Sequence, residues 1–203
     1  MVSPTPTPTL LQPTLPMSKS QKRKQERREL SLQAAVLELD LNDPRFLDEK
    51  IQVESALQYN FKDLILLREA MYTLKWYAAR LPNGVLLKEA NYGLAQYGDG
   101  VLRDVLLACW FGQLGPDNTR MLIGKVQQRV QAVITDKYLK KVADDHGITD
   151  LIRKWYPTAM MKEPGEKGIA TTIEALIGAV AIDSGGDREV LRKLLVRLLG
   201  VEL

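Results

Sequence analysis

Hydrophobic residues recur at three- and four-residue steps through most of this chain, which is the period of an α-helix. A clear example is the series Leu64, Leu67, Ala70, Met71 and Leu74. Residues with this spacing lie on one face of a helix and pack against a core. Strict alternation of hydrophobic and polar residues, as in a half-buried strand, is not convincing anywhere. The pattern therefore predicts an all-α fold.

Prolines, glycines and asparagines divide this pattern into successive helices. We expect helices at residues 30–41, 47–57, 63–80, 87 or 91 to 111, 118–133, 136–145, 149–155, 168–183 and 188–199, and a loop at 157–165. Residues 1–16 are rich in Pro and Thr, so they cannot form a helix and have little to bury. We predict a disordered, Pro/Thr-rich and basic arm over residues 1–30 and one helical domain over 31–203.

The end of the arm is strongly basic. Its basic residues are Lys19, Lys22, Arg23, Lys24, Arg27 and Arg28. Because these are six of 28 basic residues, and only two of 25 acidic residues accompany them, the rest of the chain is near neutral. We expect these six residues to bind RNA phosphates. A solvated tail, a nuclear-import patch and an organellar targeting segment are the alternative interpretations.

Composition narrows the possible locations of the protein and the kinds of site it can contain. No apolar stretch approaches the roughly twenty residues that a membrane span requires, so we expect a soluble protein without membrane contact. We expect an intracellular location, because a single cysteine fits a reducing compartment. The choice between mitochondrial and nuclear or cytoplasmic locations stays open. The single cysteine, Cys109, excludes an internal disulfide and a cysteine-based zinc site.

Two segments each place one carboxylate in an otherwise apolar helix. They are residues 91–102, NYGLAQYGDGVL, with Asp99, and residues 170–179, ATTIEALIGA, with Glu174. Ionised carboxylates are rarely buried unless they are paired, hydrogen-bonded or bound to a metal. Both acids therefore require an explanation.

Glycines accompany these acids, at Gly98, Gly100 and Gly178. A glycine weakens a helix by about 1 kcal/mol relative to alanine, unless the close approach of another backbone offsets that cost. We therefore predict that the two helices cross tightly, with the acids near the crossing.

The two segments resemble motifs of the ribonuclease III family. The first resembles its Asn-Glu-Arg-Leu-Glu-Phe-Leu-Gly-Asp-Ala-Val-Leu signature, and the second its Ala-Asp-x-x-Glu-Ala-Leu-Ile-Gly-Ala helix. Residues 59–70 and 133–143 resemble further parts of that family in the same order, so the similarity covers about 52–199. It implies the helical fold of the ribonuclease III endonuclease domain.

The resemblance also implies Mg²⁺-dependent hydrolysis of double-stranded RNA at a two-metal site. The family supplies four carboxylates, as Glu-x-x-x-Asp on one helix and Asp-x-x-Glu on another. Asp99 and Glu174 match two of them, whereas Ala95 and Thr171 occupy the positions of the missing acids. We expect these remnant acids to bind Mg²⁺ weakly, or to cap backbone amides or pair with Lys and Arg instead.

Three functional hypotheses follow. The first is an RNA-binding or ribonucleoprotein-assembly homodimer with an incomplete metal site, joined through the 91–102 helix because its glycines and aromatic residues would leave an apolar patch on a monomer. A mitochondrial ribosomal subunit among ribosomal proteins is one concrete version. The second is an active Mg²⁺-dependent endoribonuclease that cleaves double-stranded or structured RNA. The third is a pseudoenzyme that pairs with an active paralogue in RNA processing.

Overall fold

A computed structural model of the chain describes residues 36–74, 78–115, 117–154 and 163–203. The elements in order are β1 (Val36–Glu38), α2 (Pro44–Leu57), α3 (Leu64–Ala70), β2 (Ala78–Arg80), β3 (Leu86–Leu87), α4 (Tyr92–Gly112), α5 (Ile123–Val133), α6 (Asp136–Asp145), α7 (Ile148–Lys154), α8 (Glu166–Asp183) and α9 (Arg188–Leu199). The fold is mostly helical, as predicted. The predicted arm, residues 1–30, lies outside the described residues, as does most of the predicted 157–165 loop.

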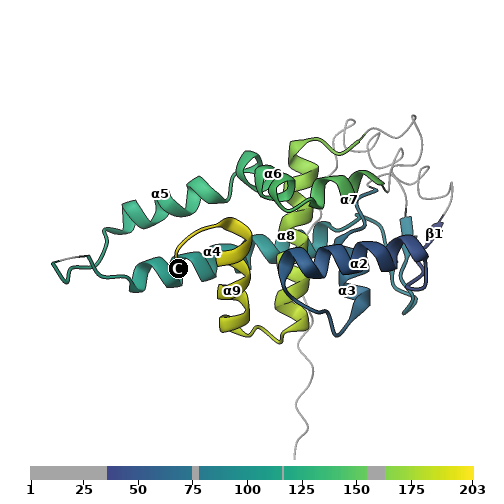
Figure 1. Cartoon of the computed structure of the whole chain (residues 1–203), viewed down its shortest axis with the longest axis horizontal. Helices are drawn as coiled ribbons and strands as arrows, with labels where there is room; N and C mark the ends of the chain where they lie inside the picture. The colour runs from purple at the N-terminus through teal and green to yellow at the C-terminus, as the bar shows by residue number, and fades with distance from the viewer. Residues whose placement is uncertain (1–35, 75–77, 116, 155–162) are drawn as a thin grey trace, which may run out of the picture.

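Helix α8 forms the centre of the domain. It passes through the middle of Figure 1, where α4 crosses it and the other helices surround the pair. From Ile169 to Ala181 every residue of α8 except Glu174 is buried. A helix that is apolar on all sides is stable only when other elements cover it, so the composition of α8 dictates its central place.

Short polar residues fix where several of these helices begin. Asp43 precedes Pro44, the first residue of α2, and its side chain accepts a hydrogen bond from the backbone N–H of Arg45. Asp187 accepts from the N–H groups of Glu189 and Val190 at the start of α9. Such caps satisfy amide groups that have no partner inside the helix. They fix the residues at which α2 and α9 begin.

Three short strands form a sheet that the sequence pattern did not predict. Strand β1 pairs in parallel with β2, and β2 pairs antiparallel with β3. The helix predicted over residues 30–41 is therefore wrong in its described part, which contains β1. The helix predicted over 63–80 ends at Ala70, and residues 78–80 form β2 instead, while 75–77 lie outside the described residues.

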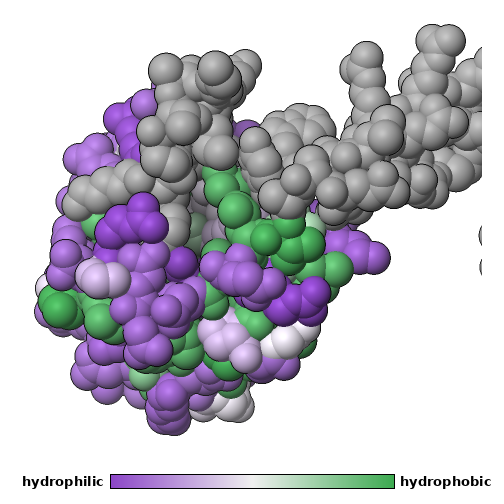
Figure 2. Space-filling model, turned by 90° about the vertical axis from the view of Figure 1, so that its right-hand side faces the viewer, coloured by the Kyte–Doolittle hydropathy of each residue, from purple (hydrophilic) through white to green (hydrophobic). Residues whose placement is uncertain are grey.

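The C-terminal part of α4 and the whole of α5 extend away from the central helix, at the left of Figure 1. Large apolar side chains are exposed there: Phe111 (46%), Leu114 (54%), Leu122 (72%) and Ile123 (57%). We call residues 111–123 the projection. The opposite end, in Figure 2, shows hydrophobic side chains only in small groups among hydrophilic ones. No described helix is long and apolar enough to cross a membrane.

Candidate functional site

Helices α4 and α8 touch through their backbones at two glycines. A Cβ atom on Gly98 would lie 1.8 Å from the carbonyl oxygen of Glu174, and one on Gly178 would lie 2.3 Å from that of Leu94. The predicted tight crossing is therefore confirmed at Gly98 and Gly178. It is wrong for Gly100, because a Cβ there would meet nothing within 4 Å.

The carboxylate of Asp99 is paired with an arginine on its own helix. The Arg103 Nε atom donates to both carboxylate oxygens of Asp99, at 3.0 and 3.1 Å. The two residues are four apart, so their side chains meet on one face of α4. Asp99 thus has the basic partner that the sequence left as one alternative to metal binding.

Glu174 is the half-buried acid of α8. Its burial, followed by the negative charges of Asp99 and Asp136, raises its pKa to about 7 against the opposing effect of Arg103 and Lys167. Near neutral pH a carboxyl group with this pKa is about half protonated. Asp99, Asp136 and Glu174 therefore form one electrostatically coupled group, which we call the acid cluster.

Asp136 is the member of the acid cluster that sequence reasoning missed. It is the first residue of α6, and it reaches the cluster because α6 packs along α8. Its position in the chain gave no signal, because the spacing rules that pair acids apply within one helix. Asp136 lies on α6, whereas Asp99 and Glu174 lie on α4 and α8. The helix boundary itself was predicted correctly.

The positions of the missing acids are closed to solvent. Ala95 is 3% exposed and Thr171 is 6% exposed. The Thr171 hydroxyl donates to the carbonyl oxygen of Lys167 at 2.7 Å, one turn earlier in α8. Since this hydroxyl is bonded within its own helix, it is not free to replace a carboxylate as a ligand.

A side-chain bridge next to these positions ties three elements together. Asn91, directly before α4, donates to the carbonyl oxygen of Ala70 at 2.8 Å and to the Thr172 hydroxyl at 3.3 Å. All three residues are buried. Asn91 thereby joins the end of α3 to α8, although its side chain does not cap α4.

The described residues do not fit the two-metal cage that the motif resemblance implies. Among them, no group of three or more His, Cys, Asp or Glu side chains is arranged to hold a metal ion. Both oxygens of Asp99 accept from Arg103, and Glu174 holds its proton up to about pH 7. Because metal ligands must be deprotonated and free, these donors favour an internal ion pair over a bound cation.

Comparison with known proteins places this crossing within a known domain. Residues 93–185, which include the facing parts of α4 and α8, match the family model of the ribonuclease III domain. No curated protein has a sequence that matches this chain.

Two solved structures, both of the nuclease domain of ribonuclease III from Campylobacter jejuni, are similar in fold. One, described as showing structural flexibility in a region involved in dimer formation, is 22% identical with a TM-score of 0.55 and covers 73% of this chain and 94% of its own. The other is 21% identical with a TM-score of 0.53, covering 73% of this chain and 92% of its own.

Proposed function

We propose that this chain, whose residues 93–185 match the ribonuclease III domain model, binds RNA as a dimer, within a ribonucleoprotein, rather than cleaving RNA. The observation that carries the proposal is the ion pair between Asp99 and Arg103, 3.0 Å long. It supplies a fixed positive charge at the carboxylate that would otherwise attract a metal ion. The cluster is thus partly neutralised without a cation from solution.

Loss of two ligands affects the whole site because a two-metal site acts as a unit. Only one acid remains on each of the two crossing helices, at Asp99 and Glu174. Ala95 and Thr171, at the other two positions, are buried and offer no anionic oxygen. Any Mg²⁺ held by the remaining acids would be weakly bound.

Exposed apolar side chains on the projection support the dimer. Monomeric proteins rarely leave a sizeable contiguous apolar patch in water. Gly98 packs against α8 inside the chain, so it cannot contribute to a dimer contact, whereas Gly100 on the same helix is exposed. We place the interface at the projection instead, and one Campylobacter jejuni structure is described as having a region involved in dimer formation.

We propose two specific forms of this role. In the first, the chain is a subunit of a mitochondrial ribosome, with ribosomal proteins as neighbours. Pairing with an active paralogue is the other form. The fold and the loss of ligands support both equally, and the six basic residues of the arm would contact RNA in either.

The proposal is tested with the purified full chain, duplex RNA and Mg²⁺. We expect a shift in RNA mobility without cleavage, and the same result for Asp99→Asn. Mg²⁺-dependent cleavage that Asp99→Asn abolishes would establish the alternative, an active endoribonuclease.

The dimer has a separate test by light scattering. We expect a mass of twice 22.8 kDa for the unmodified chain. Leu122→Glu with Ile123→Glu should give a monomer, because it places charges on the exposed apolar side chains of the projection. Ile51→Glu, at a site that is 64% exposed on α2, is the matched control and should leave the dimer intact. A monomeric unmodified chain would refute the dimer.

A further inference from the structure

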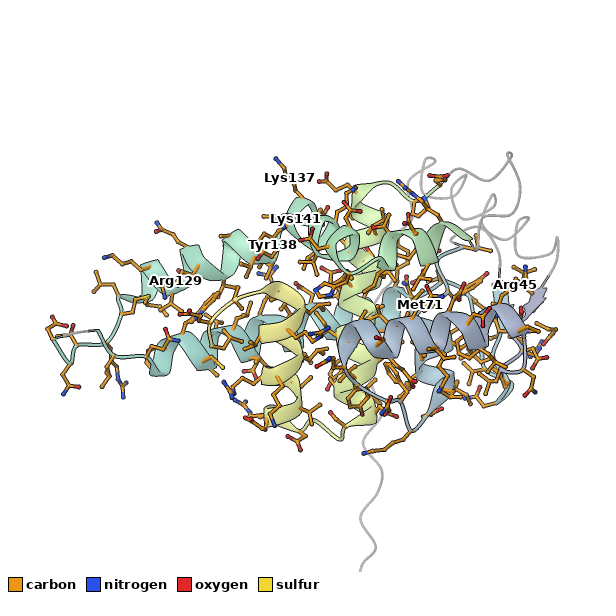
Figure 3. The ribbon with its side chains drawn as sticks, viewed as in Figure 1. Arg45, Met71, Arg129, Lys137, Tyr138 and Lys141 are labelled. Carbon is orange, nitrogen blue, oxygen red and sulfur yellow. The ribbon has the colours of Figure 1, made fainter. Side chains whose placement is uncertain are left out.

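Basic side chains gather on α5 and the start of α6. Lys125, Arg129 and Lys137 are all exposed, and we call them the α5–α6 stripe. Figure 3 shows Arg129 on α5 and Lys137 on α6, with Lys137 pointing away from the protein. Residues 118–143 contain six basic residues and a single acidic one, Asp136, although the domain as a whole is near neutral.

These three cations differ from Arg188, Arg192 and Lys193 of α9 in having no ion-pair partner among the described residues. Within the described part of the chain, no ion pair includes Lys125, Arg129 or Lys137. The neighbouring Lys141, by contrast, pairs with Asp145 one turn later in α6. Because the three charges are not neutralised locally, they leave a positive potential over this face.

Helix α9 provides the contrast. It also has a basic face, but Arg188 lies 3.0 Å from Asp104, and Arg192 and Lys193 lie 3.1 and 3.6 Å from Glu189. Arg197 donates to the carbonyl oxygen of Ala56 at 3.1 Å. The sequence gives both faces the same basic character, and the structure shows that only the α5–α6 stripe keeps its charge available.

We propose that the α5–α6 stripe binds the phosphate backbone of duplex RNA, an inference that rests on the proposed function. Lys125 and Arg129 are four residues apart on one helix, so their Cβ atoms lie about 5–6 Å from each other and can contact neighbouring phosphates. Gln128 and Gln131 are exposed on the same helix and add neutral donors.

The side chains on this face favour duplex over single-stranded RNA. Proteins that bind single strands stack the bases on exposed aromatic rings. The aromatic residue next to the stripe, Tyr138, is only partly exposed, and its hydroxyl donates to the carbonyl oxygen of Leu199 at 2.7 Å. The exposed aromatic ring of Phe111 lies on the projection, under the guanidinium of Arg120, so it is already stacked. Charge without a ring on the stripe itself suits the regular phosphates of a duplex.

The test compares two triple variants of the full chain. Lys125→Ala with Arg129→Ala and Lys137→Ala removes the stripe, and Arg188→Ala with Arg192→Ala and Lys193→Ala removes the same charge from α9. We expect the stripe variant to bind duplex RNA at least about 10-fold more weakly at moderate salt, and its salt dependence to fall by about 0.9 per lost phosphate contact. The α9 variant should change affinity less than about 2-fold.

Each outcome separates this inference from the proposed function. If the unmodified chain binds no RNA, both are refuted. If it binds duplex RNA and the stripe variant binds equally well, the stripe is refuted while RNA binding stands. Equal losses of RNA affinity in the two variants would show that binding depends on net charge alone, and would refute the stripe. Tighter binding of the unmodified chain to a single strand of the same sequence would refute it as well. Thermal melting of both variants should match that of the unmodified chain, because all six side chains are at the surface.

Discussion

Two neighbouring regions of the α4–α8 crossing, both within the residues that match the ribonuclease III domain model, differ in how closely the helices pack. At the glycine contact, Gly98 and Gly178 allow the two backbones to touch, and no larger residue fits. Next to the acid cluster, Ala95 and Thr171 are buried at the positions where the family resemblance implies two further acids. The glycines set the helix packing, whereas Ala95 and Thr171 stand where we expect ligands, so the proposed loss of ligands is compatible with an intact fold.

The largest effect is expected at the glycine contact. Gly98→Ala would put a methyl group 1.8 Å from a backbone oxygen, so the helices must separate. We expect the free energy of unfolding to fall by about 4 kcal/mol. Chemical denaturation followed by circular dichroism measures this.

Gly100→Ala is the matched control on the same helix. A Cβ there meets nothing within 4 Å, so the variant should be stabilised by up to about 1 kcal/mol through helix propensity. Equal stability of the Gly98→Ala and Gly100→Ala variants would contradict the close crossing.

The next effect tests whether the acid cluster still has the family's geometry. Ala95→Glu with Thr171→Asp adds two acids at buried positions, which should lower the free energy of unfolding by about 3 kcal/mol without Mg²⁺. Mg²⁺ should then restore about 2.7 kcal/mol when present at a hundred times its dissociation constant. Thermal melting with and without Mg²⁺ reports both changes, and Mg²⁺-dependent cleavage of duplex RNA is a second readout.

The neutral pair Ala95→Gln with Thr171→Asn controls for size and should show no response to Mg²⁺. Either single acid should respond little. If the doubly acidic variant is not stabilised by Mg²⁺, these positions no longer face a common site.

A smaller effect is expected from the titration of Glu174. Its folded-state pKa, about 7, lies above its ordinary value of 4.5, so the folded protein holds this proton more tightly than the unfolded chain does. The resulting stability is full below about pH 4.5 and is lost as the pH rises through about 7. Glu174→Gln should therefore be more stable than the unmodified chain at pH 8, by about 1–2 kcal/mol after allowance for solvent screening.

At pH 4 the two proteins should be equally stable, because Glu174 is then protonated in both states. The measurement is the difference in unfolding free energy across this range. A difference that does not change with pH would show that Glu174 has an ordinary pKa.

The smallest effect is expected at the Asp99–Arg103 pair. Both side chains are partly exposed, at 27% and 41%, and the residues are four apart on one helix. Such pairs contribute about 0.3–0.5 kcal/mol. A double-mutant cycle with Asp99→Ala and Arg103→Ala should give a coupling energy of this size, and it should decrease in high salt. A coupling energy near zero would show that Arg103 does not neutralise the charge of Asp99 in the acid cluster.

Much of this fold could be predicted from the sequence, because the residues that mark these helices are close together in the chain. The helix at 188–199 and that at 136–145 were predicted with their exact bounds, since a cap residue and a glycine or histidine mark their ends. The crossing was predicted because two motifs each combine an acid with a helix-weakening glycine. Both kinds of signal lie within a dozen residues.

The features that could not be predicted depend on contacts between residues that are far apart in the chain. Strand β1 pairs with β2, and Leu37 lies opposite Ala79, a partner that no local pattern indicates. Ala78 and Ala79 favour helix by intrinsic propensity, yet both are buried in a strand, so packing overrides propensity there. The partners of the basic residues on α9 and of Asp136 are equally invisible in the sequence.

The touching of α4 and α8 also has a consequence for how the chain folds. Gly98 and Gly178 are eighty positions apart, and the long loop between them must close before their contact contributes any stability. Contacts of such wide sequence separation slow folding. During synthesis, α4 leaves the ribosome long before α8 has been translated, so the apolar face of α4 stays exposed until then. We therefore expect the domain to acquire its native core only late in translation, and truncated chains that end before residue 178 to aggregate.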